Sequence, residues 1–474
     1  MNKLTVTFAL LLSITIIAQP NIEWQRSLGG SEDEYAKSIQ QTNDFGFIIT
    51  GYTNSNDGDV SVNYGAADYW VIKLDASGNL SWQRSFGGTY SDEANSIQQT
   101  DDGGYIVAGS SESNDGYVSG NNGGKDYWIV KLDTSVNLSW QTSLGGSNNE
   151  VPHSIQQTND FGYIVAGVST SDDGDVSGNN GSGDCWIVKL DVSGNLSWQR
   201  SLGGSGWDQA NSIQQTDDGG YIVAGFSTSN DGDVSGSNGF LDSWIVKLDV
   251  SGNITWQKSL GGSNDEVAYS IQQTSDGGYI VAGASNSTNG DVSGNNGAED
   301  SWIVKLDGSG NISWQRTLGG SGNDWAETIE QTTDGGYIVG GMSNSNDGDV
   351  SGNNGDYDIW IVKLDVSGNI TWQESLGGSN VDIAYSIQQT SDGGCIVAGA
   401  SNSNNGDVSG NNGMDDYWIV KLGPFGGIEQ LTNTKKELVK IIDFMGRETE
   451  FKPNTPLIFI YSDGTRERVM EIEE

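Results

Sequence analysis

The stretch Ala94–Trp140, ANSIQQTDDGGYIVAGSSESNDGYVSGNNGGKDYWIVKLDTSVNLSW, contains the pattern that decides the fold. With the three residues that follow, it holds four short segments, ANSIQQT, YIVAGSS, YWIVKLD and NLSWQTS, which are rich in Val, Ile, Tyr and Trp. Apolar and polar residues alternate along each segment, which predicts β-strands. DDGG links the first two segments and a DxSGN-type turn links the last two, both typical of hairpins. The stretch is therefore predicted to form four antiparallel strands.

This unit recurs with a period of 58 residues, which two series of tryptophans mark. The first series is Trp24, Trp82, Trp140, Trp198, Trp256, Trp314 and Trp372, and the second is Trp70, Trp128, Trp186, Trp244, Trp302, Trp360 and Trp418. Seven copies fill residues 22–422, and a fixed period of this size indicates a solenoid, a propeller or an array. Four antiparallel strands per copy predict an all-β, seven-bladed β-propeller. A β-solenoid is the alternative, although three reversals of direction are awkward within one coil.

The two ends of the repeat region predict how the ring closes. Ile22–Leu28 has the pattern of a fourth strand, whereas the last copy ends after a third strand at Tyr417–Leu422. We therefore expect these two segments to pair, so that the N-terminal strand completes the seventh blade. Closure also removes a sheet edge that would otherwise be exposed to pairing with other chains.

Composition limits the partners. Among 474 residues, 22 are Lys or Arg and 63 are Asp or Glu, which gives a net charge of −41. This charge argues against nucleic acid or an anionic membrane as partner. Cys185 and Cys395 each replace an aromatic residue of the repeat at different repeat positions, so no disulfide is expected. We expect a monomer.

The N-terminal segment predicts export. Met1–Lys3 is positively charged and Leu4–Ala18 is an uncharged apolar run, which together indicate a signal peptide over residues 1–18. The run is short for a membrane span, and a retained anchor is the alternative. No other apolar run approaches 18 residues, so the mature chain is expected to lack a membrane span.

The motif YWIVKLDxSGNxxWQxSxGG resembles the strand–turn–Trp signature of bacterial β-propeller repeats, including those of quinoprotein-like propellers. The resemblance implies that the recurring tryptophans pack between neighbouring blades. It does not extend to enzymatic activity, because a quinone-dependent dehydrogenase needs a cofactor site and the sequence shows no unique constellation for one.

The C-terminal segment differs from the repeat. Residues 423–436 are predicted to be a linker, and residues 437–474 a small β domain. Lys440–Glu448 and Leu457–Val469 resemble the C-terminal sorting domain of the type IX secretion system of Bacteroidetes. The resemblance implies the type IX secretion machinery as a partner, and a secreted or outer-membrane-surface location in a Gram-negative, Bacteroidetes-like bacterium. A small β add-on domain without a sorting role is the alternative.

The long loop between the second and third strands of each copy, DGDVSGNNGxxD in its fullest form, predicts calcium as a cofactor. Oxygen-bearing residues at loop positions 1, 3, 5 and 12 echo the spacing of an EF-hand loop. In three copies these residues are Asp173, Asp175, Ser177 and Asp184; Asp231, Asp233, Ser235 and Asp242; and Asp347, Asp349, Ser351 and Asp358. The alternative is that Asp, Asn and Ser only cap turns through Asx hydrogen bonds.

Strand alternation places the tight hairpin turns on one face of the ring. The long loops and the blade-to-blade connections share the opposite face, on which we expect binding. Five aromatic residues, assigned to these connections, are the predicted ligand-binding residues, since aromatic rings stack on sugars and anchor protein partners: Tyr35, Trp207, Tyr269, Trp325 and Tyr385. Local packing is the alternative for them. His153, the only histidine, is interpreted as an incidental surface residue.

The sequence therefore favours a secreted or cell-surface, non-catalytic binding or adhesion propeller for an extracellular glycan or protein. Seven near-copies supply the same residues seven times, whereas a catalytic site needs different residues in different roles, so no catalytic residue is assigned. Two alternatives remain open: a carbohydrate-active enzyme, such as an endoglucanase-like hydrolase or a lyase, and a structural surface-layer component.

Overall fold

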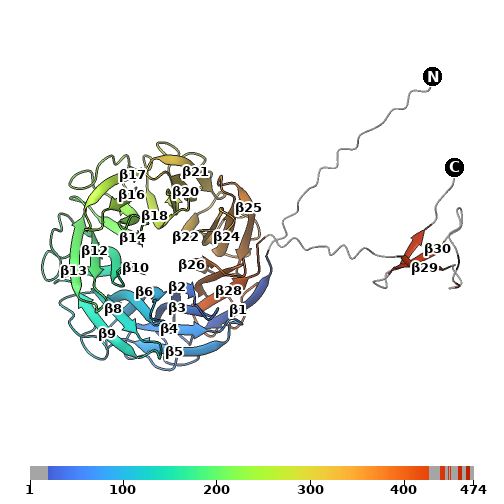
Figure 1. Ribbon diagram of the computed structural model, residues 1–474, viewed down its shortest axis with the longest axis horizontal. Helices are drawn as coiled ribbons and strands as arrows, with labels where there is room; N and C mark the ends of the chain where they lie inside the picture. Colours follow the sequence, from blue (N-terminus) through green and yellow to red (C-terminus); the bar gives the residue numbers. More distant parts are fainter. Residues whose placement is uncertain are drawn as a thin grey trace, which may run out of the picture. The chain divides into compact units, whose positions relative to one another are not determined.

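The computed structural model confirms the predicted seven-bladed β-propeller (Figure 1). It describes residues 20–425, 438–442, 447, 449, 457–461 and 466–469, and the predicted signal peptide lies outside these residues. Seven four-stranded antiparallel sheets form a ring around a central opening, and the described part of the chain contains no helix. Within the same part, no helix long and apolar enough to cross a membrane is found.

Each blade runs outward from an inner strand that borders the central opening (Figure 1). The inner strands are β2 (Glu34–Gln41), β6 (Asp92–Gln99), β10 (Glu150–Gln157), β14 (Asp208–Gln215), β18 (Glu266–Gln273), β22 (Asp324–Gln331) and β26 (Asp382–Gln389). The second strands are β3 (Phe47–Thr53), β7 (Tyr105–Ser111), β11 (Tyr163–Ser169), β15 (Tyr221–Ser227), β19 (Tyr279–Ser285), β23 (Tyr337–Ser343) and β27 (Cys395–Ser401). The third strands are β4 (Asp68–Leu74), β8 (Asp126–Leu132), β12 (Asp184–Leu190), β16 (Asp242–Leu248), β20 (Asp300–Leu306), β24 (Asp358–Leu364) and β28 (Asp416–Leu422). The outer strands are β5 (Leu80–Phe86), β9 (Leu138–Leu144), β13 (Leu196–Leu202), β17 (Ile254–Leu260), β21 (Ile312–Leu318), β25 (Ile370–Leu376) and β1 (Ile22–Leu28).

The ring closes as the sequence predicts. The seventh sheet has the order β1-β28-β27-β26, and β1 pairs antiparallel with β28 from Ile22 opposite Leu422 to Leu28 opposite Tyr417. The first strand of the repeat region is thus the outer strand of the last blade, so the two ends of the repeat region hold each other in place.

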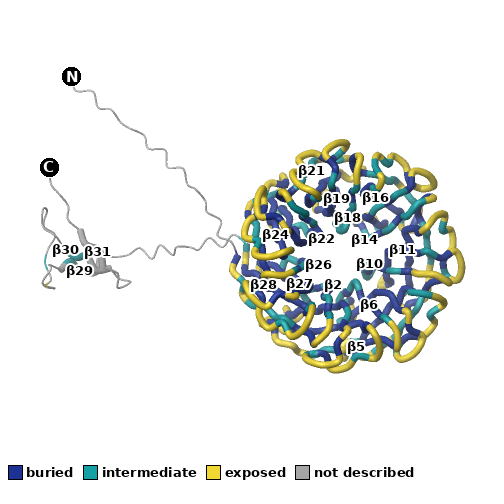
Figure 2. Tube along the Cα trace, turned by 180° about the vertical axis from the view of Figure 1, so that it is seen from behind, coloured by how far each residue is buried: buried dark blue, intermediate teal, exposed yellow. Residues whose placement is uncertain are grey.

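The core lies between neighbouring blades. Trp128 of β8 is fully buried against Tyr69 of the preceding blade, with ring centroids 4.6 Å apart. The Tyr69 hydroxyl donates a hydrogen bond of 2.9 Å to the Trp128 carbonyl oxygen. The half-buried Trp82 of β5 contacts Tyr105 of the following blade edge to face. Both tryptophan series therefore pack across blade junctions, and Figure 2 shows the buried strands between exposed loops.

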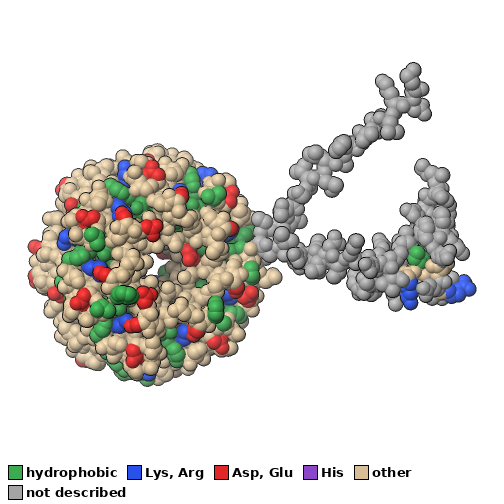
Figure 3. Space-filling model, in the orientation of Figure 1, with side chains coloured by type: hydrophobic (Ala, Val, Ile, Leu, Met, Phe, Trp, Pro, Cys, Tyr) green, Lys and Arg blue, Asp and Glu red, His purple; other side chains and the backbone are tan. Residues whose placement is uncertain are grey.

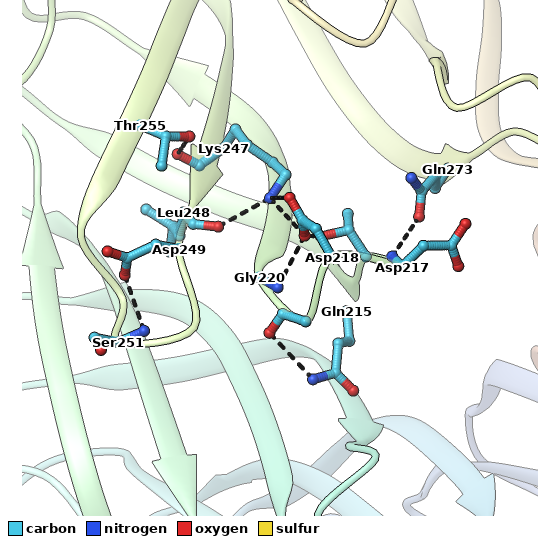
Figure 4. Close-up of polar contacts among 12 residues, drawn as sticks. Gln215, Asp217, Asp218, Gly220, Lys247, Leu248, Asp249, Ser251, Thr255 and Gln273 are labelled. Carbon is cyan, nitrogen blue, oxygen red and sulfur yellow. Dashed lines mark hydrogen bonds and ion pairs between the residues drawn. The ribbon is translucent and has the colours of Figure 1, made fainter.

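A recurring ion pair supports the hairpin face. In the fourth blade, the buried Lys247 places its Nζ 2.9 Å from the Asp218 carboxylate and donates to the Leu248 carbonyl oxygen at 3.0 Å (Figure 4). The adjacent Asp217 backbone N–H donates to Gln273 of the next blade at 2.9 Å. Because the lysine stem is buried and its charge is paired, this arrangement ties each β-hairpin to the third strand.

Every inner strand carries a β-bulge after its third residue. In β6 the pairing with β7 passes from Ala94 to Ser96, so Asn95 has no partner in the register. The residue opposite the bulge is Gly109, and a Cβ there would overlap the Glu93 carbonyl oxygen. A bulge redirects one side chain out of the normal alternation. The glycine of the YIVAG segment is therefore required by the close approach of the bulged backbone.

The C-terminal residues form a separate unit. It contains a three-stranded antiparallel sheet in the order β29-β30-β31, built from β29 (Leu438–Ile442), β30 (Leu457–Tyr461) and β31 (Arg466–Val469). These strands agree with the expectation of a small C-terminal β domain. Cys185 and Cys395 are both buried and free, which confirms that they form no disulfide.

Two adjacent glycines of β23 test the bulge. A Cβ on Gly341 would overlap the Trp325 carbonyl oxygen, whereas a Cβ on Gly340 would lie 3.2 Å from side-chain atoms of Ile387 and Thr328. We expect Gly341→Ala to lower the free energy of unfolding by about 1–3 kcal/mol, as overpacking does. Gly340→Ala should leave it unchanged or raise it by up to about 0.5–1 kcal/mol, because glycine weakens strand interiors. Chemical denaturation measures both, and equal effects of the two variants would contradict the bulge geometry.

Candidate functional site

The seven bulge residues converge on the central channel. They line a chamber of about 350 Å³ together with Gln209. The bulge residues are Lys37, Asn95, His153, Asn211, Tyr269, Glu327 and Tyr385. Since the inner strands begin after the blade-to-blade connections, their first residues lie at the long-loop end of the channel. Figure 3 shows the channel as an opening at the centre of the ring.

The channel beyond the chamber is lined by repeating residues. Ile39 and Gln40 and their equivalents surround this section, which has a volume of about 260 Å³. Each Gln side chain accepts a hydrogen bond from the inner-strand backbone of the next blade, as Gln40 does from Gln99 N–H at 2.6 Å. Glu330 takes this position in the sixth blade and accepts from Gln389 N–H at 2.5 Å. The side-chain oxygens are thus used to join blades, and this section is structural.

In contrast, the chamber combines different functional groups. Lys37 Nζ lies 3.4 Å from the ring centroid of Tyr385 and 5.4 Å from that of Tyr35, so two aromatic faces contact one ammonium group. Such cation–π contacts stabilise a partly buried ammonium group by about 0.5–2 kcal/mol. The Tyr35 hydroxyl donates to Asp415 at 2.6 Å, which holds the ring in place. One wall of the chamber is therefore aromatic and cationic.

Burial changes the charge states in the chamber. Desolvation lowers the pKa of Lys37 to about 8, although Glu327 and Glu93 favour its charged form. Desolvation also raises the pKa of Glu327 to about 7 and lowers the pKa of His153 to about 4, the latter with a contribution from the charge of Lys37. At neutral pH the chamber therefore presents a cationic Lys37, a neutral His153 imidazole and a Glu327 carboxyl group that is about half ionised.

A polar network orders the wall formed by the fourth blade. The Trp207 indole N–H donates to Gln209 at 3.3 Å, and the Gln209 amide donates to Asn211 at 2.9 Å. Asn211 in turn donates to the Ala268 carbonyl oxygen of the next blade at 2.9 Å. Trp207 is half-buried and lies just before β14, so it holds chamber residues in position through Gln209.

The structure corrects the location of four of the five aromatic residues predicted to bind ligand. Tyr35, Tyr269, Trp325 and Tyr385 lie in inner strands and not in the blade-to-blade connections. Tyr35 and Trp325 do so because each inner strand begins two residues earlier than the repeat pattern indicates, whereas Tyr269 and Tyr385 occupy the second position of the predicted first segment. Tyr269 and Tyr385 face the chamber, and Tyr35 contacts its lysine. Trp325 donates to Glu299 at 2.6 Å and stacks on Tyr357. Trp207 alone lies in a connection. Ligand binding by these residues stays a prediction.

The interpretation of His153 as an incidental surface residue is wrong. It lies in the chamber wall on the bulge of β10, where its pKa is lowered. The sequence signal that could have located it is the variation itself. This position holds five residue types in seven copies, close to invariant residues such as Ile155 and Gln157.

The residues of the predicted calcium loops have structural partners. In the third blade, Asp173 accepts from Ser147 N–H at 2.7 Å and Asp175 accepts from Gly145 N–H at 3.2 Å. Ser177 Oγ accepts from the Gln199 amide, and Asp184 accepts from Asn180 N–H at 2.9 Å. The copies at Asp231, Asp233, Ser235 and Asp242 and at Asp347, Asp349, Ser351 and Asp358 repeat these contacts.

Only the Asp184 contact lies within the loop, whereas Asp173 and Asp175 accept from the blade-to-blade connection at Gly145 and Ser147. In the part of the chain that the structure describes, no group of three or more His, Cys, Asp or Glu side chains is arranged to hold a metal ion. Calcium binding within a loop stays a prediction.

The single histidine allows a direct measurement of the chamber. We expect the imidazole proton resonances to titrate with a pKa of about 4 in the folded protein, because desolvation disfavours the charged form. Lys37→Met should raise this pKa by removing the neighbouring charge, without restoring the ordinary value. Since the folded pKa lies below that of the unfolded chain, His153 should lower stability as the pH falls from about 6.5 to 4. A folded-state pKa near 6.5 would contradict the burial of His153.

Comparisons with known proteins identify no family. No family model matches the sequence. A segment of 170 residues, 34% of the chain, is 29% identical to the regulatory protein FlaEY of Caulobacter vibrioides and spans only 18% of that protein.

Solved structures that resemble the chain have low sequence identity. The WD40 domain of Neurospora crassa Pan2 is 11% identical with a TM-score of 0.47, over 85% of this chain and 97% of that one. A puromycin hydrolase is 12% identical with a TM-score of 0.47, over 94% and 62%. An α-L-arabinanase of Penicillium chrysogenum, solved with arabinobiose, is 10% identical with a TM-score of 0.40, over 85% and 98%. None of these similarities assigns a ligand or an activity to this chain.

Proposed function

We propose that the chain is a secreted or cell-surface, non-catalytic binding propeller whose chamber receives part of an extracellular glycan or protein. The observation that carries this proposal is the variation of the bulge position. Between flanking strand positions that are nearly constant, the bulge position presents Lys, Asn, His, Asn, Tyr, Glu and Tyr to one shared space. A binding site needs such a set of different groups, whereas a structural ring position repeats one residue.

Size and chemistry support a polar ligand. The chamber volume of about 350 Å³ is at the small end of ligand pockets, which suits a single sugar ring or one side chain of a partner. Tyr269 and Tyr385 offer aromatic faces, and Asn95 and Asn211 offer amide groups for hydroxyl or amide recognition. A second depression of about 450 Å³ on the hairpin face is lined by residues such as Lys189, Trp198 and Tyr221 that recur in other blades, which favours the chamber.

The chamber favours binding over glycoside hydrolysis. Most glycosidases need two carboxyl groups on opposite sides of the scissile bond. Glu327 is the only carboxyl group among the described residues that line the chamber. Its raised pKa of about 7 would suit a general acid, which keeps a carbohydrate-active enzyme as the second candidate.

The extracellular location belongs to the same proposal. The apolar run at Leu4–Ala18 supports a signal peptide, and the resemblance of Lys440–Glu448 and Leu457–Val469 to a sorting domain supports export by the type IX secretion machinery. The pairing of β30 with β31 supplies the hairpin that the second of these segments requires.

Binding to arrays of fractionated polysaccharides and outer-surface proteins tests the proposed function. We expect Tyr269→Ala and Glu327→Ala each to weaken binding by about tenfold or more, because each removes a group worth about 1.4 kcal/mol or more in a desolvated site. Phe240→Ser is the matched control, since Phe240 is 74% exposed on a long loop outside the chamber.

Unchanged affinity in both chamber variants would contradict the chamber as the site. Release of reducing sugars that Glu327→Ala abolishes would support the enzyme instead. Ligand-free assembly into a regular lattice would support a structural surface-layer role.

A further inference from the structure

A second set of buried acidic groups recurs at the blade junctions, away from the chamber. Each junction pairs the first residue of a third strand with the first residue of the next blade's inner strand, and all of these side chains are fully buried. The pairs are Asp68 with Asp92, Asp126 with Glu150, Asp184 with Asp208, Asp242 with Glu266, Asp300 with Asp324, Asp358 with Asp382, and Asp416 with Glu34. Fourteen buried carboxyl groups need an explanation, because buried charges are costly unless they are paired.

The two acids of a pair face the same small space. At the junction of the second and third blades, a Cβ on Gly145 would lie 2.5 Å from Asp126 Oδ1 and 2.5 Å from Glu150 Oε2. The two carboxylates can approach the backbone this closely only because residue 145 has no side chain. The same glycine recurs at every junction, as Gly29, Gly87, Gly145, Gly203, Gly261, Gly319 and Gly377.

One oxygen of each pair lacks a partner. Glu150 accepts hydrogen bonds from Ser169 Oγ at 2.8 Å and from Gly146 N–H at 2.7 Å, and Asp126 Oδ2 accepts from Asn122 N–H at 2.8 Å. Asp126 Oδ1 is buried and has no hydrogen-bond partner among the described residues, and the same holds for the equivalent Asp of all seven junctions. A buried carboxylate oxygen without a protein donor, next to a second carboxylate, can be satisfied by a proton, a cation or a bound water.

We propose that each blade junction binds a calcium ion between its two buried carboxylates. Calcium accepts six to eight oxygen ligands at 2.3–2.6 Å in flexible geometry, so two carboxylates can bind it with waters and backbone carbonyl oxygens completing the shell. At the junction just described, Asp126 Oδ1 and Glu150 Oε2 are the protein ligands. Because they belong to adjacent blades, the ion links one blade to the next.

A third acid adds negative charge at six of the seven junctions. Asp175, from the long loop of the third blade, accepts from the Gly145 N–H and lies close enough to Asp126 to disfavour its ionisation. Tyr117 replaces this acid at the Gly87 junction, where its backbone N–H donates to the Gly87 carbonyl oxygen. The Gly87 junction should therefore bind calcium most weakly.

This assignment differs from a calcium site within one loop. The acids of the loop Asp173–Asp184 are divided between two junctions: Asp175 lies at the Gly145 junction, and Asp184 lies with Asp208 at the Gly203 junction. Asp173 belongs to neither pair, since its Oδ1 accepts from Ser147 N–H. Because Glu150 belongs to no long loop, the two assignments predict different effects of substitutions at Glu150 and Asp173.

Equilibrium dialysis of the chelator-treated full chain against radioactive calcium counts the sites. We expect six to seven equivalents per chain and a higher melting temperature with calcium than with chelator. Asp126→Asn should lose one equivalent, because Asn keeps an acceptor for the Asn122 N–H while it removes the charge. Glu150→Gln should lose the same equivalent of calcium. It tests the same site if Asp126→Asn does not fold. Tyr117→Asp should strengthen the weakest site.

Asp173→Asn is the matched control and should retain every equivalent, since its oxygen can still accept from Ser147 N–H. Absence of calcium binding to the wild-type chain at millimolar free calcium would overturn the proposal. So would loss of an equivalent in Asp173→Asn but not in Asp126→Asn. A protonated-carboxyl band in the infrared spectrum that disappears in Asp126→Asn, with calcium present throughout, would also overturn it by showing that the pair shares a proton.

Discussion

The packing of aromatic side chains across blade junctions is the interaction on which the rest of the structure depends. A four-stranded blade has two apolar faces and cannot bury either one alone, so each blade is stable only between two neighbours. Trp128 with Tyr69 and Trp82 with Tyr105 form one such junction. Because every blade needs a neighbour on both sides, the row must return to its start, and the pairing of β1 with β28 provides that return.

Packing requires the seven copies to be alike, whereas a binding site requires different side chains. The β-bulge allows both, because it separates one variable position from the packed ones. Residues that pack between blades must fit the same partners seven times, which leaves them little freedom to differ. The bulge residue has no cross-strand partner and projects into the channel, so its identity is not constrained by the ladder. Lys37, His153 and Glu327 can therefore occupy equivalent positions without disturbing the blades that carry them. The scaffold is uniform and the chamber is specific for this reason.

The acidic residues illustrate how one composition serves different local purposes. On the hairpin face, Asp218 and its equivalents balance buried lysines. At the blade junctions, carboxyl groups such as Asp126 and Glu150 are buried against each other with no lysine within the pair. In the chamber, burial raises the pKa of Glu327 to about 7. The net charge of −41 thus includes acidic side chains in three different environments. The partners of each carboxyl group, and not the total charge, determine its role.

The sequence by itself determined the strands, the seven blades and the closure of the ring, because alternation, turn residues and a constant period are local or countable properties. It did not locate the chamber. Tyr269, Tyr385 and His153 lie 58 residues or more apart in the chain, and only closure brings their bulges to one axis. It also grouped Asp175 with Asp184 as parts of one loop, whereas the tertiary structure places them at different junctions with acids from other strands. Both limits share a physical cause: a site between blades is formed by residues that no single repeat contains.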